Sequence, residues 1–245
     1  MASIQDDRGY NQGYKPSKSL EVRDKRRCGY ILSKMELNPE KKILEIGCGT
    51  GELAYMMAQQ TNCKILGMDI CVRFIEQARK NFNLPNLEFK VLDFNDADNL
   101  KKVTEEHRFD YIVGNGILHH LYYNMGEALS NINSLLKTGG KIIFLEPNFY
   151  NPYCLLIFKI KFFRKLARLE PGETTFTKRA ITKKLEKALF SDIEVEYRDF
   201  LVPGTPDFLI EPVVLIGDMI EKIPVLNMLA QSIYISARKK ELAKC

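Results

Sequence analysis

The sequence is poor in the residues that build metal and disulfide sites. It contains three histidines and six cysteines, and no two cysteines stand at C-x-x-C spacing. A structural zinc site requires four soft ligands at short paired spacings, and disulfide frameworks belong mainly to small exported domains. We therefore expect no bound metal and free thiols.

Long apolar runs are also missing. No stretch approaches the roughly 18 apolar residues that a transmembrane helix requires. The N-terminal sequence MASIQDDRGYNQGY is polar and lacks the apolar core of a signal peptide. These absences predict a cytoplasmic protein. No repeat or low-complexity tract divides the 245 residues, so we expect a single domain over 1–245 in which a tail and helix occupy 1–38.

The charge is unevenly distributed. The formal net charge is +5, yet residues 158–187 alone contain ten Lys or Arg against three Glu. A concentrated basic segment favours an anionic partner, which can be a phosphate group, a membrane surface or a nucleic acid. A solvated helix face is the alternative interpretation.

Short apolar segments alternate with amphipathic ones along the first 150 residues. This order predicts a parallel sheet covered by helices on both faces, the doubly wound α/β fold. The last of these helices is expected to end at Lys137-Thr138-Gly139-Gly140, where glycine supplies a positive φ. The predicted strands are Lys42–Ile46, Lys64–Asp69, Leu87–Leu92, Tyr111–Val113, Lys141–Leu145, Ile193–Phe200 and an antiparallel Ser232–Ala237. The predicted helices are Ser19–Met35, Glu52–Gln60, Val72–Asn81 and Met125–Leu136.

A glycine-rich loop, ILEIGCGTG at 43–51, ends the first predicted strand. Glycine at alternate positions lets the backbone turn tightly and approach a ligand. The following helix presents free N–H groups and its positive dipole end. A dinucleotide fingerprint would require glycine where Glu52 stands, and a P-loop would require G-K-[ST], which is absent. The loop therefore predicts a cradle for a zwitterionic ligand.

Two acids follow this loop at the ends of the next strands. Asp69 ends the second strand, where a carboxylate can accept hydrogen bonds from both hydroxyls of a ribose. Asp93 ends the third strand, where an acid can accept from the adenine amine while Phe94 lies against the ring. Together with the glycine loop, these residues predict an adenosine-type cofactor.

The residues from Lys41 to Asn148 carry a family resemblance through ILEIGCGTG, GMDI, VLDF, NGILHH and GGKIIFLEPN. This order resembles the class I S-adenosylmethionine-dependent methyltransferases of the small-molecule "type 11" kind. The resemblance implies a Rossmann-like seven-stranded sheet of order 3-2-1-4-5-7-6 and S-adenosyl-L-methionine as cofactor. It implies as cofactor-binding residues Glu45, Gly47, Cys48, Gly49, Gly51, Asp69, Ile70, Asp93, Phe94, Asn115 and Gly116. The resemblance ends near Pro152, so it implies no substrate.

Candidate catalytic groups stand after the fourth and fifth strands. A hydroxyl acceptor requires a base, and His119 and His120 lie on the rim where ligands bind in open α/β sheets. We predict His119, His120 and Glu146 as catalytic residues and prefer His119 as the base. The structural alternatives are a histidine turned into the fold and a carboxylate at Glu146 that fixes a loop.

The N-terminal region supplies further candidates. Tyr10 and Tyr14 lie in a Gly-rich tail, which either closes over the sulfonium or forms a plain terminus. Arg23 and Arg27 stand one helical turn apart. They can reach the carboxylate of the methionine moiety, but we expect both to be solvated at the surface.

Residues 149–176 and 202–230 are longer than ordinary connections and predict a substrate lid. The first mixes large apolar groups with closely spaced cations, and the second is apolar. Two interpretations stay open. The insertions pack together over a small soluble substrate, or they also dock at the inner face of a membrane and admit a lipid-linked acceptor.

These observations predict a methyltransferase that acts on O or N of a small-molecule or lipid/glycan-linked acceptor. One alternative is a nucleic-acid methyltransferase. The N/D-P-P-Y/F motif of base-methylating enzymes is missing, because the fourth strand is followed by Asn115-Gly116-Ile117-Leu118. A non-catalytic cofactor-binding module is the other alternative, and the intact cofactor motifs argue against it.

Overall fold

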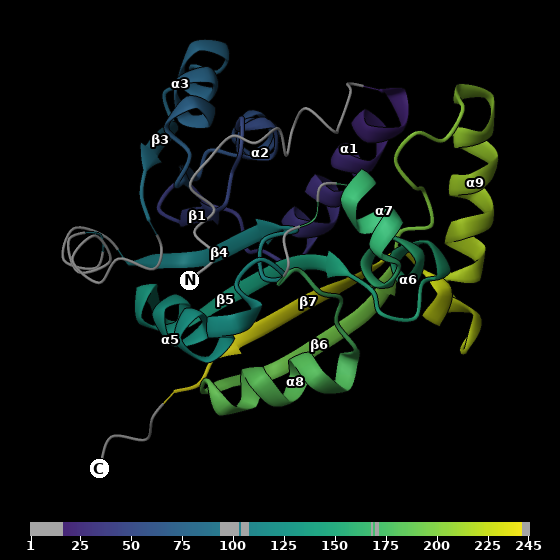
Figure 1. Cartoon of the computed structure of the whole chain (residues 1–245). Helices are drawn as coiled ribbons and strands as arrows, with labels where there is room; N and C mark the ends of the chain where they lie inside the picture. Colours follow the sequence, from purple (N-terminus) through teal and green to yellow (C-terminus); the bar gives the residue numbers. More distant parts are fainter. Residues whose placement is uncertain (1–16, 94–102, 104–107, 168, 170–171, 242–245) are drawn as a thin grey trace.

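The computed structural model describes residues 17–93, 103, 108–167, 169 and 172–241. Within them, a seven-stranded sheet has the order β3-β2-β1-β4-β5-β7-β6, which confirms the predicted doubly wound α/β fold (Figure 1). Strands β1 to β5 are parallel, and β7 runs antiparallel to both of its neighbours. The strands are β1 Lys42–Ile46, β2 Lys64–Asp69, β3 Leu87–Val91, β4 Phe109–Asn115, β5 Leu136–Pro147, β6 Phe190–Arg198 and β7 Ser232–Lys239.

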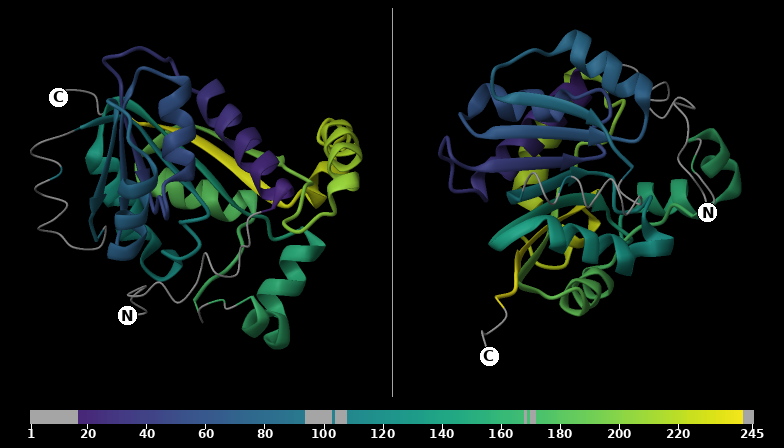
Figure 2. Two further views of the ribbon diagram at one scale, coloured as in Figure 1. Left: turned by 90° about the horizontal axis from the view of Figure 1, so that it is seen from above. Right: turned by 90° about the vertical axis from the view of Figure 1, so that its left-hand side faces the viewer.

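Helices cover both faces of the sheet (Figures 1 and 2). One face carries α1 Lys18–Ser33, α2 Glu52–Gln60 and α3 Val72–Asn81. The other carries α5 Met125–Leu135 and α8 Lys178–Lys187. The insertions contain α6 Pro152–Lys159, α7 Lys161–Leu166, α9 Asp207–Ile220 and the short 3-10 helix η2 Leu226–Leu229, whereas the 3-10 helix η1 Tyr122–Asn124 lies between β4 and α5. None of the described helices has both the length and the apolar character needed to cross a bilayer.

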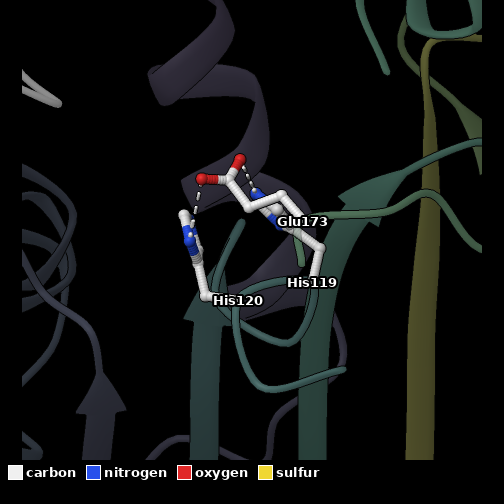
Figure 3. Close-up of side chains that lie close together, drawn as sticks. All are labelled: His119, His120 and Glu173. Carbon is white, nitrogen blue, oxygen red and sulfur yellow. Dashed lines mark ion pairs between the residues drawn. The ribbon is translucent and has the colours of Figure 1, made fainter. Parts of the chain in front are cut away.

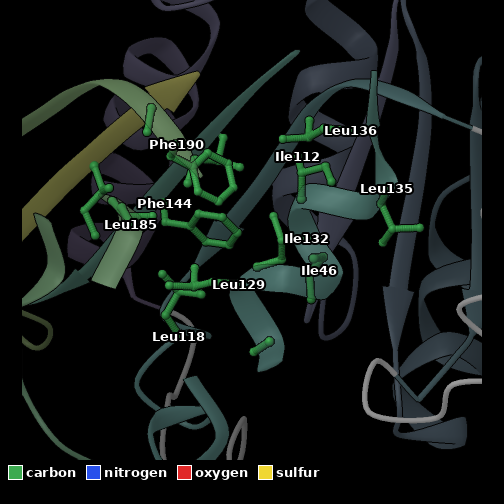
Figure 4. Close-up of a cluster of buried hydrophobic side chains, with 14 of the residues drawn as sticks. Ile46, Ile112, Leu118, Leu129, Ile132, Leu135, Leu136, Phe144, Leu185 and Phe190 are labelled. Carbon is green, nitrogen blue, oxygen red and sulfur yellow. The ribbon is translucent and has the colours of Figure 1, made fainter. Parts of the chain in front are cut away.

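Each face of the sheet has its own apolar core. On the α5 and α8 side, Phe144 of β5 is fully buried among side chains that include Leu129 and Leu185 (Figure 4). On the α1 to α3 side, Ile43 and Val113 pack against helix residues such as Met57. Because β1 and β4 are covered on both faces, they contain apolar residues at consecutive positions, Ile43 and Leu44 in β1 and Tyr111–Val113 in β4.

The glycine predicted to end α5 has a different role. The helix ends at Leu135, and Leu136 already belongs to β5. Gly139, with φ of +72°, lies within β5, where Phe109 pairs with Leu136 but Tyr111 pairs with Lys141. The positive φ of Gly139 therefore accommodates an irregularity in the pairing of β4 with β5. The prediction that this glycine ends the helix is wrong.

The expectation that Arg23 and Arg27 are solvated is also wrong. Both side chains are buried, and their Nε atoms lie 3.3 and 3.2 Å from Oδ2 of Asp199, which follows β6. Burial disfavours a charged Arg27, yet the carboxylate of Asp199 raises its pKa overall. Arg27 also donates to Ser232 Oγ at 2.9 Å. These bonds fasten α1 to the end of the sheet.

Replacing Asp199 with Asn tests this anchor. The change leaves two buried guanidinium groups without their carboxylate, and breaking a buried pair costs about 3–5 kcal/mol. Asp218→Asn is the matched control because Asp218 pairs with Arg26 where both side chains are partly exposed. An ion pair at such a position contributes less than about 1 kcal/mol to the free energy of unfolding. Urea unfolding measures both free energies. Equal losses for the two variants would refute the anchoring role.

Candidate functional site

The loop after β1 requires glycine at particular positions. Gly47, Gly49 and Gly51 have φ values of +67°, +52° and +90°. A Cβ on Gly47 would come within 2.6 Å of Ile117 Cδ1, and a Cβ on Gly51 would come within 2.6 Å of Phe89 Cζ. Both the backbone conformation and the close packing therefore require glycine at these two positions.

Asp69 holds the loop from the end of β2. Its Oδ2 accepts from the Gly49 N–H at 2.9 Å, and its Oδ1 accepts from the Cys71 N–H at 2.9 Å. Burial raises the pKa of Asp69, and these backbone hydrogen bonds oppose that rise. Each carboxylate oxygen has two lone pairs, so Asp69 retains capacity for ribose hydroxyls, as the sequence predicts.

Glu45 of β1 is a buried acid beside the loop, with 2% of its surface exposed. Its Oε2 is buried and has no hydrogen-bond partner in the described structure. Burial, followed by the nearby carboxylate of Glu52, raises the pKa of Glu45 well above its usual range. A cationic donor would relieve this cost, and the ammonium of a methionine moiety is such a group. The residues thus fit S-adenosylmethionine.

The other predicted cofactor residues occupy the same edge with differing environments. Cys48 is buried, which raises the pKa of its thiol. Asn115 Oδ1 accepts from Arg27 Nη1 at 2.6 Å, so its amide is oriented by α1. Gly116, with φ of +71°, makes the turn after β4. Ile70 and Asp93 are partly exposed. Phe94, Tyr10 and Tyr14 lie outside the described residues.

Glu146, at the end of β5, organises the loop that follows β4. It is 1% exposed. Its Oε1 accepts from the N–H groups of Ile117 and Leu118 at 3.0 and 2.7 Å. Its Oε2 accepts from the N–H of His119 at 3.3 Å and lies 2.9 Å from the same residue's Nδ1. The carboxylate fixes the loop and one ring nitrogen together.

Glu173 completes a buried cluster with the two histidines (Figure 3). Its Oε2 lies 3.8 Å from His119 Nε2, and its Oε1 lies 3.4 Å from His120 Nδ1. Burial, with a smaller contribution from His119, lowers the pKa of His120 to about 2, which leaves that ring neutral near pH 7. Glu173 belongs to the insertion 149–176, and the sequence analysis missed it because no spacing pattern links it to the histidines.

The insertion also covers the histidines with apolar groups. The Phe158 ring of α6 lies edge-on to His119 with centroids 5.9 Å apart. Arg164 donates to the backbone carbonyls of Phe158 and Glu173 at 2.8 and 3.2 Å. The Arg164 side chain therefore connects α6 to the segment of the insertion that contains Glu173.

His119, His120 and Glu173 together could hold a metal ion, because their ligand atoms lie within 4.8 Å of one another. Imidazole binds a metal in its ring plane at about 2.0–2.1 Å. The two rings are tilted by 35° with centroids 4.1 Å apart. The same nitrogens and carboxylate can exchange a proton, so this geometry is compatible with either a metal site or proton transfer.

Comparison with known proteins identifies the family. A family model described as a methyltransferase domain matches residues 37–196, which include every predicted cofactor and catalytic residue. The chain belongs to the S-adenosylmethionine-dependent methyltransferases of class I. The resemblance read from the motifs and the predicted cofactor are both confirmed.

The relatives differ in size and in what their names describe. The chain is 32% identical over 175 residues to the highly reducing polyketide synthase easB of Emericella nidulans, covering 66% of this chain and 7% of that protein. It is 28% identical over 123 residues to a malonyl-[acyl-carrier protein] O-methyltransferase of Acetivibrio thermocellus, covering 49% and 41%. The chain thus spans less than half the length of these relatives.

A solved structure supports the fold of this methyltransferase. The S-adenosylmethionine-dependent methyltransferase from Archaeoglobus fulgidus superposes with a TM-score of 0.60 at 20% identity, covering 89% of this chain and 94% of that one. At this identity the likeness concerns the fold alone.

Asp69→Ala tests the cofactor site. Losing charged hydrogen bonds to the ribose should weaken S-adenosylmethionine binding by about 1.5–3 kcal/mol. Titration calorimetry measures the affinity, with NAD as the control ligand, and circular dichroism verifies that the variant folds. Unchanged affinity, or tighter binding of NAD, would contradict the assignment of Asp69.

Proposed function

We propose that this methyltransferase transfers a methyl group to an oxygen or nitrogen that must lose a proton, on a small molecule or on a lipid- or glycan-linked acceptor. The observation that carries the proposal is the contact of Glu146 with His119 Nδ1, at 2.9 Å. A buried carboxylate that accepts from Nδ1–H leaves the Nε2 lone pair as the ring's proton acceptor. The tautomer is assigned from this contact.

The surroundings of His119 support its role as a base. Nε2 points to the side where Glu173 lies, at the carboxyl edge of the parallel strands, where ligands of open sheets bind. The acceptor's proton passes to Nε2, and the imidazolium then lies between the carboxylates of Glu146 and Glu173 before the proton leaves to solvent. S-adenosylmethionine supplies the methyl group and the sulfur leaving group. The remaining protein contribution is alignment and exclusion of water.

The insertion places an apolar group beside the proposed base. The Phe158 ring lies edge-on to His119, so an apolar side chain adjoins the polar cluster. An acceptor with one ionisable atom on an otherwise apolar body matches this surface. The named oxygen acceptor of the malonyl-carrier relative agrees with an acceptor of this kind.

Labelling tests the proposed function directly. The protein is incubated with cofactor labelled in the methyl group and with lipid, small-metabolite and RNA fractions of cells. We expect label in a lipid or small-molecule product, with the new methyl on O or N by mass spectrometry and NMR. Label in RNA, a carbon-methylated product, or no labelled product despite cofactor binding would overturn the proposal.

His119→Ala should lower kcat on the labelled acceptor by about 10²–10⁴, the range for losing a general base. Cofactor affinity should be almost unchanged. His120→Ala is the control because it removes the neighbouring ring of the stacked pair, and we expect a loss below about tenfold. Melting temperatures separate lost catalysis from lost folding. Full turnover in the His119 variant would return this residue to a structural role.

Chelation separates proton chemistry from metal chemistry at the same cluster. Because the proposal assigns proton transfer to His119 without a metal, dialysis against EDTA should leave the labelling rate unchanged. Adding zinc should lower the rate, since a metal on Nε2 blocks proton transfer. A rate that falls with EDTA and recovers with Mn²⁺ or Zn²⁺ would show that the cluster acts as a metal site instead.

A further inference from the structure

Helix α9 exposes an apolar face that no described element covers. Phe208, Leu215 and Met219 are 79%, 66% and 61% exposed. With Pro212, they follow one another at spacings of four, three and four residues, so they share one side of the helix. The opposite side packs inward through Ile210 and through Gly217, where a Cβ would meet Phe200 at 3.0 Å. The exposed face is thus not a by-product of a loosely attached helix.

The insertion 149–176 exposes apolar and cationic groups together. In α7 and the turn before it, Ile160, Phe162 and Leu166 are 46%, 71% and 72% exposed. Lys159, Lys161 and Lys165 stand exposed between them. Between Glu146 and Glu170 the chain contains five Lys or Arg and no acid. We call residues 152–166 the basic arm.

The basic arm and α9 lie on the same side of the molecule. The arrows of β4 and β5 point toward the side where α6, α7 and α9 stand (Figure 1). The view from above shows the arm and α9 as two separate projections on that side (Figure 2, left). The arm reaches the candidate site through Phe158, whose ring contacts His119. Both exposed surfaces therefore flank the edge at which the acceptor binds.

We propose that α9 and the basic arm dock together on an anionic lipid bilayer. The arm's cations meet the headgroup charge while Phe162 and Leu166 enter the apolar boundary, as in interfacial amphipathic helices. Lysine stems extend along apolar surface and keep their charge at the headgroups. The α9 face contributes burial of apolar side chains but little electrostatic attraction to an anionic bilayer. Asp218 and Glu221 of this region form ion pairs with Arg26 and Arg198, and Glu211 remains exposed.

Charge makes a bilayer a better occupant than a second copy of the chain. A two-fold interface through the arm would set its cations against the same cations, because symmetric contacts pair a surface with itself. An anionic surface has no such conflict. Docking does not depend on the proposed function. Delivery of a lipid-linked acceptor from the bilayer to His119 does depend on it.

Vesicle co-sedimentation tests the docking without cofactor or acceptor. The vesicles are phosphatidylcholine alone, and phosphatidylcholine mixed with phosphatidylglycerol. We expect the protein to sediment with the anionic vesicles at low salt, to bind phosphatidylcholine far less, and to dissociate at high salt, because surface charges are then screened.

Two variants test the two surfaces separately. Lys159→Gln, Lys161→Gln and Lys165→Gln together should lower partitioning onto anionic vesicles by about 100-fold, since each lysine near such a surface contributes roughly a factor of five. Arg164 stays unchanged because it binds backbone carbonyls. The variant Phe208→Ser, Leu215→Ser and Met219→Ser should lower partitioning onto both kinds of vesicle. All these side chains are exposed, and melting temperatures verify the fold.

The matched control changes three exposed lysines away from this side: Lys64→Gln, Lys80→Gln and Lys187→Gln. It removes the same net charge, so partitioning should stay within about twofold of the unaltered protein. Protein that stays in the supernatant with anionic vesicles at low salt overturns the proposal, as does an equal loss in the control. Dimers that dissociate only in the α9 variant would assign that face to a second copy. Failure of methyl labelling with intact vesicle binding would overturn the proposed function alone.

Discussion

The carboxylate of Glu146 is the interaction on which the candidate site depends. In a parallel sheet the loops carrying chemistry all leave from one edge, and nothing in the strand ladder holds them relative to one another. Glu146 supplies that connection, because it accepts three consecutive backbone N–H groups after β4 and also contacts His119 Nδ1. The same carboxylate therefore fixes both the position of the loop and the orientation of the His119 imidazole.

The insertion 149–176 links the candidate site to the molecular surface. Glu173 lies beside the histidines, and the basic arm exposes its apolar and cationic side chains to solvent. Arg164 joins them by donating to the carbonyls of Phe158 and Glu173. The Arg164 side chain therefore connects the arm to the segment that carries Glu173, and this connection would link the proposed docking to the proposed acceptor site.

Most of the sheet could be predicted because its signals are local. Segments such as Lys64–Asp69 and Val72–Asn81 coincide with β2 and α3, since burial on both faces and helical periodicity leave their marks within a few residues. The roles of Arg23, Arg27 and Gly139 were misjudged because their partners are distant. Asp199 lies more than 170 residues from Arg27 along the sequence. A charged side chain is predicted to be exposed to solvent when its partner is unknown.

The sequence by itself determined the fold class, the strand order through the family resemblance, and the cofactor edge, because glycines and acids at strand ends have narrow local uses. Only the tertiary structure decided which polar groups meet at the candidate site. Glu146 contacts His119 from a neighbouring strand, and Glu173 arrives from an insertion. It also decided that the face of α9 and the basic arm both stay exposed on the same side of the molecule, as two separate projections (Figures 1 and 2). Whether a side chain is buried depends on which other parts of the chain pack over it, and a local sequence pattern does not contain that information.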